Sequence, residues 1–238
     1  MIRNLKALGL ALAAAFAFGA ISASGASATT EPNGHFWCDG YPCSFSGEQP
    51  AGDKHKIVTA AGSIECEVTK VHALLSGPTY GLTATPTFEE CIFHNSLSGI
   101  DNPATVTMNG CDTKFTIHFH ETSKGEGFKA DTYSGDVHIE CPVGKVIEIH
   151  VYNNAGHTEV KCTFHIAPQT VDNIDYFDHT SSAIDIRTTE APTAVKRTQG
   201  SLLQCGAENQ TAKYSGSVTA KSSNEGGGTT DGGINPTL

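Results

Sequence analysis

The sequence predicts an all-β protein, an antiparallel β-sandwich stabilised by disulfides. Between Ala104 and Pro168, four short runs alternate apolar and polar residues with the period of a half-buried strand. Eight cysteines lie beyond residue 28, and an even number in an exported chain indicates a disulfide framework. Helical periodicity is nearly absent after the N-terminal segment, and turn residues separate the strand-like runs.

Residues 1–28 have the pattern of a signal peptide. Arg3 and Lys6 precede an apolar run, Ala7–Ile21, and the small residues Ala26–Ala28 fit a cleavage site. No later stretch approaches the roughly 20 apolar residues that a helix needs to cross a bilayer. We therefore expect a secreted, extracellular protein with no membrane span after signal cleavage.

The expected mature chain is acidic. Removal of Arg3 and Lys6 leaves 13 of the 15 Lys and Arg against 25 Asp and Glu, a formal charge of −12. Binding to nucleic acid requires clustered basic residues. The composition therefore argues against nucleic acid as a partner and against anionic membranes.

The chain beyond the signal peptide divides into three parts. Residues 29–56 are expected to form an N-terminal arm, with a small disulfide loop between Cys38 and Cys43. Residues 57–221 contain the strand-like runs and are assigned to the sandwich, as a single domain or as two packed halves. Residues 222–238 are rich in Gly, Ser and Thr and are expected to be a disordered tail.

The arm carries Phe36, Trp37 and Tyr41 around its two cysteines. Exposed aromatic side chains of this kind bind sugars or hydrophobic partners through large flat surfaces. The alternative interpretation is that they pack onto the sandwich, which is favoured because aromatic residues dominate protein cores.

The first strands suggest one disulfide directly. Ile64, Cys66 and Val68 alternate with glutamates, so Cys66 is expected to face inward, and the following run carries Cys91. A bond between Cys66 and Cys91 is the first expectation for a pair that is distant in the sequence.

Asn109–Gly110 is the strongest turn signal in the chain, because both central positions of a type I′ hairpin require a positive φ. A two-residue hairpin at this point would place Met108 opposite Cys111 and Val106 opposite Thr113.

The next three runs are interpreted as a meander. Its turns would place His138 opposite Glu148 and Glu148 opposite Thr163. Cys141 and Cys162 would then lie on the outer strands, roughly 10 Å apart, which exceeds the reach of a disulfide. Their partners would come from Cys111 and Cys205, and the preferred pairs are Cys111–Cys141 and Cys162–Cys205.

After Pro168 the alternation weakens, and residues 170–183 are expected to be a solvated acidic loop. Strands are expected again at 183–188, 194–198 and 212–221. The segment Tyr214–Val218 resembles Tyr133–Val137 in sequence, Tyr-Ser-Gly followed by a polar residue and Val, and each is interpreted as a recurrent strand opening.

No common catalytic motif is present: there is no nucleophile elbow, zinc-binding His-Glu-x-x-His, phosphate loop or dinucleotide fingerprint. Imidazole and carboxylate side chains on one polar sheet face are candidate ligands for Zn or Cu, although such residues also occur on any solvated face. The candidate metal ligands are His118, His120, His138, Glu148, His150 and His165. Acidic residues are plentiful enough for a glycoside hydrolase, but no cleft can be inferred from sequence.

Several short motifs follow one another between residues 57 and 221. They are Ile64-Glu65-Cys66, Cys91, Asn109-Gly110-Cys111, Ile139-Glu140-Cys141-Pro142-Val143-Gly144-Lys145, Cys162, Leu203-Gln204-Cys205-Gly206 and Tyr214-Ser215-Gly216-Ser217-Val218-Thr219. Their order resembles a group of uncharacterised secreted, disulfide-containing all-β proteins of actinomycete-type bacteria. This resemblance implies export and disulfides, and it implies no activity.

The sequence thus favours a noncatalytic, secreted binding or structural protein without a cofactor, whose partner is an extracellular ligand or a cell-surface polymer. Two alternatives stay open, a transition-metal protein that uses the histidines and, less favoured, an extracellular glycoside hydrolase.

Overall fold

The computed structural model describes residues 34–121, 131–179, 183–224 and 228–235, which belong to one compact unit, Glu31–Leu238. The expected signal peptide lies outside the described residues. The strands are β1 His35–Cys38, β2 Cys43–Glu48, β3 His55–Thr59, β4 Gly62–Leu75, β5 Gly81–Asn95, β6 Asp101–Thr107, β7 Asp112–Glu121, β8 Asp131–Glu140, β9 Ile147–Tyr152, β10 Val160–Ile166, β11 Gln169–His179, β12 Ala183–Gln199, β13 Asn209–Asn224 and β14 Gly232–Asn235; the one described helix is α1, Leu202–Cys205.

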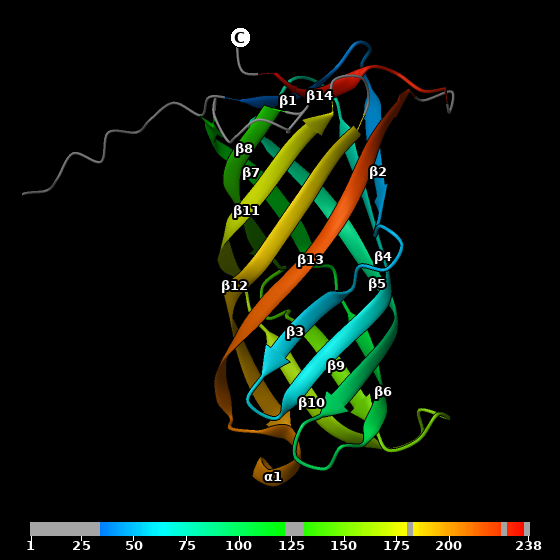
Figure 1. Cartoon of the computed structure of the whole chain (residues 1–238), viewed down its shortest axis with the longest axis vertical. Coiled ribbons are helices and arrows are strands. Elements are labelled where there is room, and N and C mark those ends of the chain that lie inside the picture. Colours follow the sequence, from blue (N-terminus) through cyan, green and yellow to red (C-terminus); the bar gives the residue numbers. More distant parts are fainter. Residues whose placement is uncertain (1–33, 122–130, 180–182, 225–227, 236–238) are drawn as a thin grey trace, which may run out of the picture. The chain divides into compact units, whose positions relative to one another are not determined.

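Twelve of these strands form a single antiparallel sheet whose pairings close into a ring (Figure 1). β4, β5, β12 and β13 are long and continuous. Each of these four strands fills one position in the ring by itself. Every other position holds two shorter strands, one after the other beside the same neighbours, namely β2 and β3, β6 and β7, β8 and β9, and β10 and β11. Counted in this way, the ring has eight positions in chain order, and β13 closes it against β2 and β3.

The all-β, antiparallel and disulfide-bonded parts of the prediction are confirmed, whereas a sandwich of two separate sheets is not. The strands pair around one continuous ring, and their alternate side chains point inward to a shared core. No helix among the described residues is long and apolar enough to span a membrane.

The turn at Asn109–Gly110 forms, but it does not make a hairpin. Both residues have positive φ, 53° and 80°, and the Cys111 amide donates to the Met108 carbonyl at 2.8 Å. β6 and β7 then pair with successive parts of the same strand, β5, rather than with each other. The predicted pairing of Val106 with Thr113 is therefore wrong, because the turn interrupts one long strand position instead of reversing the chain.

All four expected disulfides are present. They join Cys38 to Cys43, Cys66 to Cys91, Cys111 to Cys141 and Cys162 to Cys205. Cys66 and Cys91 are direct cross-strand partners in β4 and β5. Cys111 and Cys141 flank the paired residues Asp112 and Glu140, so this disulfide ties together the junctions at which β6 becomes β7 and β8 becomes β9.

The two ends of the ring carry different structures. α1 lies at one end, and the two-stranded sheet of β1 and β14 lies at the other (Figure 1). Phe36 of β1 is fully buried, and its ring meets the ring of Tyr176 edge-on at 6.1 Å. Ile234 of β14 is also buried.

Two predicted boundaries differ from the structure. Cys43–Glu48, assigned to the arm, is β2 and pairs with β4 and β13. The predicted tail contains the end of β13 and the whole of β14, which pairs with β1. Gly-rich sequence orders here because Ile234 supplies a buried apolar side chain and β1 supplies backbone partners.

Candidate functional site

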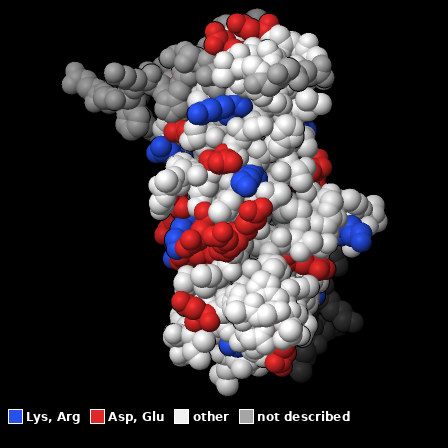
Figure 2. All heavy atoms as spheres, turned by 90° about the vertical axis from the view of Figure 1, so that its right-hand side faces the viewer, with Lys and Arg blue, Asp and Glu red and all other residues white. Residues whose placement is uncertain are grey.

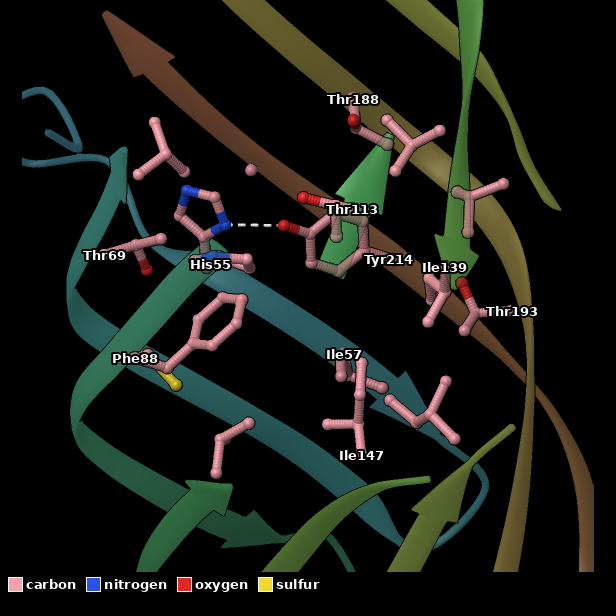
Figure 3. A pocket seen from close by; sticks show the side chains of 18 of the residues that line it. His55, Ile57, Thr69, Phe88, Thr113, Ile139, Ile147, Thr188, Thr193 and Tyr214 are labelled. Atoms are coloured by element: carbon pink, nitrogen blue, oxygen red, sulfur yellow. Dashed lines mark hydrogen bonds between the residues drawn. The ribbon is translucent and has the colours of Figure 1, made fainter. Parts of the chain in front are cut away.

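An internal cavity of about 130 Å³ lies in the core of the ring. Most of its lining is aliphatic or aromatic, and none of the lining residues is Asp, Glu, Lys or Arg. Its polar lining side chains are His55, Thr69, Thr113, Thr188, Thr193 and Tyr214 (Figure 3). Such a cavity suits a small apolar molecule, since an engineered apolar cavity of about 150 Å³ binds benzene.

His55 and Tyr214 form the best-defined polar contact in this lining. His55 Nδ1 lies 2.6 Å from the Tyr214 hydroxyl, and His55 Nε2 lies 3.0 Å from the Ser217 carbonyl oxygen (Figure 3). A carbonyl can only accept, so Nε2 donates to it and Nδ1 of the neutral ring accepts from Tyr214. The hydroxyl proton of Tyr214 is thereby used, while its oxygen keeps the capacity to accept.

A glycine lets β13 approach this imidazole. A methyl group built on Gly216 would lie 2.5 Å from His55 Nδ1, closer than carbon and nitrogen can approach without displacement. Gly216 and Tyr214 are both on β13. β13 therefore fixes the position of His55 with two hydrogen bonds, one from the Tyr214 hydroxyl and one to the Ser217 carbonyl, and Gly216 leaves room for the ring.

Burial keeps both groups uncharged. It lowers the pKa of His55 below the ordinary value of 6.5, although the bond to Ser217 and the charge of Asp53 act in the opposite direction. Burial also raises the pKa of Tyr214. The cavity therefore contains no formal charge at neutral pH.

The lowered pKa of His55 predicts a pH-dependent stability. Well above pH 6.5 His55 is neutral in both the folded and the unfolded chain. As the pH falls below 6.5, the unfolded chain takes up the proton first, so the free energy of unfolding falls by up to about 1.4 kcal/mol per pH unit. Chemical unfolding at pH 7.5, 6.5 and 5.5 measures this loss. His55→Gln is expected to reduce the slope without abolishing it, because burial also lowers the pKa of His35. An unchanged slope in His55→Gln would contradict the assignment.

Thr69 is the one polar lining residue whose side-chain oxygen is buried without a hydrogen-bond partner among the described residues. Thr69 as a whole is 1% exposed. The Thr113 hydroxyl, by contrast, donates to the Ala84 carbonyl at 2.9 Å. Thr69 lies opposite Phe88 in the ladder between β4 and β5, and the Phe88 and His55 rings are 5.9 Å apart.

The wall of the ring is interrupted next to these residues. β5 pairs with β7 through Gly81–Ala84 and with β6 through Cys91–His94. Residues 85–90 of β5 thus have no ladder partner on that side within the described strands. An outer hollow of about 500 Å³ lies at this place, and Phe88 and Val106 line both the hollow and the internal cavity.

The predicted metal ligands fall into two separate groups. Asp136 lies between two of them, with His118 Nε2 at 2.8 Å and His138 Nε2 at 3.1 Å. Glu148 lies between His150 and His165, at 3.6 and 3.7 Å. The side chain of His120 is outside the described part of the structure. No group of three or more His, Cys, Asp or Glu among the described residues is arranged to hold a metal ion.

The predicted meander register is wrong. β8 pairs with β7 and β11, so His138 faces Lys114 and Thr170 instead of Glu148. Glu148 faces His165, two residues from the expected partner. A two-residue shift preserves the inward face, which is why the pattern of buried residues alone cannot detect it.

The three aromatic residues of the arm do not form one exposed surface. Phe36 is buried in the end of the ring, Trp37 is half-buried, and Tyr41 is 40% exposed. The Tyr41 hydroxyl accepts a hydrogen bond from the Cys38 amide at 3.2 Å. Phe36 thus has the packing role that was the favoured prediction for the aromatic residues of the arm.

No protein-family model, curated protein or solved structure matches this chain.

Proposed function

We propose that the protein is an exported, noncatalytic binding protein whose internal cavity takes a small, uncharged and largely apolar molecule. The observation that carries this proposal is a cavity of about 130 Å³ whose lining contains no formally charged residue. Apolar lining and a few fixed polar groups are typical of small-molecule sites. Under this proposal the extracellular ligand binds inside the ring and not on the aromatic arm, where Phe36 is buried.

Export is supported by the covalent structure. Four disulfides, with no free cysteine among the described residues, suit a compartment in which thiols are oxidised. We also infer that opposite walls of the ring act as the two packed layers expected of a sandwich, because one core lies between them. A body locked in this way would retain its cavity outside the cell.

Binding of toluene tests the proposal. The full chain with its disulfides formed is expected to bind toluene with a dissociation constant of about 1 mM or below, and saturating toluene should raise the midpoint of thermal unfolding. Calorimetry and thermal unfolding provide the measurements.

A filled cavity supplies the control. Val171 lines the cavity and Val143 is fully exposed in a turn. Val171→Phe is expected to abolish toluene binding, whereas Val143→Phe, the same change on the surface, should leave it intact. The proposal fails if the unaltered chain binds no toluene, or if both variants bind it equally well.

A further inference from the structure

We propose that Thr69, His55 and Tyr214 form a polar corner of the cavity that anchors the hydroxyl group of a small, uncharged aromatic alcohol. This inference rests on the proposed function and specifies the ligand class. The three residues come from neighbouring strands, β4, β3 and β13, and Figure 3 shows Thr69 and Tyr214 on either side of His55.

The unpartnered Thr69 hydroxyl is the first reason. A buried hydroxyl without a hydrogen bond destabilises the folded protein, and Thr69 has such a hydroxyl while lining a cavity. A ligand group that bonds to Thr69 Oγ1 would remove this destabilisation. That oxygen is itself fully buried, so a ligand reaches it only when the Thr69 side chain turns about χ1 and presents the hydroxyl to the cavity that the residue lines.

The hydrogen-bond inventory of the corner is the second reason. Thr69 can donate and accept, whereas Tyr214 already donates to His55 and can only accept further. A ligand hydroxyl also donates and accepts, so it can bond to either oxygen. An ionised ligand group would need an opposite charge for burial, and the cavity lining offers none.

The approach to the corner favours the same class. Phe88 lies between the corner and the outer hollow, since it lines both the cavity and the hollow. Residues 85–90 of β5, which include Phe88, have no backbone pairing with β6 or β7. Rotation of the Phe88 side chain would open a path without breaking strand pairing. The hollow is bordered by Glu67, Glu89 and Glu90, and acidic side chains are prominent on this side of the molecule (Figure 2). Such a rim disfavours anionic amphiphiles such as fatty acids.

Phenol and toluene distinguish the anchoring role from simple apolar burial, because they differ by a hydroxyl in place of a methyl group. With the full disulfide-bonded chain, calorimetric titration should give a phenol affinity at least tenfold above that of toluene, and no binding of benzoate. Thr69→Val is expected to weaken phenol binding about tenfold and to leave toluene binding unchanged or stronger.

Thr113→Val is the matched control. It makes the same chemical change in the same cavity at a hydroxyl that already has a partner, so phenol affinity should change less than threefold. Toluene binding by each variant verifies that the cavity is intact. Phe88→Ala should accelerate association and dissociation of both ligands in stopped-flow measurements.

The outcomes separate the two proposals. Equal affinities for phenol and toluene in the unaltered chain, or a Thr69→Val variant with undiminished phenol affinity, would overturn the polar corner while the cavity remains a binding site. Tight binding of benzoate would overturn the uncharged ligand class. Failure to bind either neutral ligand would reject the binding function itself.

Discussion

Replacing Cys162 and Cys205 together by alanine is expected to lower the free energy of unfolding by about 4 kcal/mol. This disulfide joins residues 43 positions apart, and the chain entropy that a cross-link removes from the unfolded state grows with the length of the closed loop. It also fastens α1, at one end of the ring, to β10. Urea unfolding followed by circular dichroism measures the loss.

The disulfide between Cys38 and Cys43 gives a control with similar burial and a much shorter loop. Its cysteines are 3% and 0% exposed, against 0% for both Cys162 and Cys205, but they are only 5 positions apart. The same entropy relation gives about 2 kcal/mol for the Cys38→Ala and Cys43→Ala double variant. An equal or larger loss from the short loop would show that loop length does not determine the contribution of these disulfides.

The cysteine pairs could be predicted because strand periodicity constrains them. Cys66 and Cys91 occupy inward positions on two consecutive runs, and consecutive antiparallel runs usually become neighbours. The other two long-range pairs follow from the predicted meander, although the register of that meander is wrong. The expectation that Cys141 and Cys162 do not bond to each other is nevertheless confirmed. They lie at different heights along neighbouring positions of the ring, because Cys162 faces Val151 of β9 whereas Cys141 directly follows β8, whose Ile139 faces Gln169.

Closure of the ring could not be predicted, because local patterns do not specify which strands become neighbours. Asn109–Gly110 requires a turn, but the same turn can either reverse the chain or interrupt a strand. Here it interrupts a strand, because β6 and β7 both pair with β5. β11 was missed for a different reason. Its register shifts between Val171 and Ile174, and Asn173 has a positive φ of 64°, so the bulge breaks the alternation by which strands are recognised.

The cavity was invisible in the sequence, because residues that line a cavity and residues that fill a core are of the same types. One signal could have identified Thr69. Alternation predicts that Val68 faces inward after Cys66, whereas Val68 is half-exposed and Thr69 is buried. The adjacent Glu89 and Glu90 on β5 are both exposed and mark the same change of phase. Two consecutive charged residues within a strand pattern thus mark the part of β5 that has no partner in β6 or β7.

The repeated Tyr-Ser-Gly segments have a common packing explanation. In each, the glycine admits a group that a methyl would displace: the His55 ring at Gly216, and the Thr116 carbonyl oxygen at Gly135. The two groups differ in how easily they can move away. An imidazole can turn aside, but the Thr116 carbonyl belongs to the backbone of β7, and register shifts lie beside Gly135 in its pairings with both β7 and β11.

Gly135→Ala is therefore expected to destabilise the protein by about 3 kcal/mol or more, at or beyond the upper end for overpacked sites. An added Cβ would lie 1.9 Å from the Thr116 carbonyl oxygen and 3.0 Å from the Tyr176 ring. Relief requires β7 and β8 to separate where Tyr176 donates to the Thr116 carbonyl at 3.2 Å. The midpoint of urea unfolding, with the slope checked against that of the unaltered chain, measures the effect.

Gly77→Ala controls for the intrinsic difference between glycine and alanine. A Cβ at Gly77 meets nothing within 4 Å, and its φ lies outside the positive region, so a change within about 0.5 kcal/mol is expected. If Gly135→Ala is equally mild, β7 and β8 must be able to move apart without loss of packing. The close approach at Gly135 would then not be what holds β7, β8 and β11 together at this point of the ring, and the shared Tyr-Ser-Gly sequence would need another explanation.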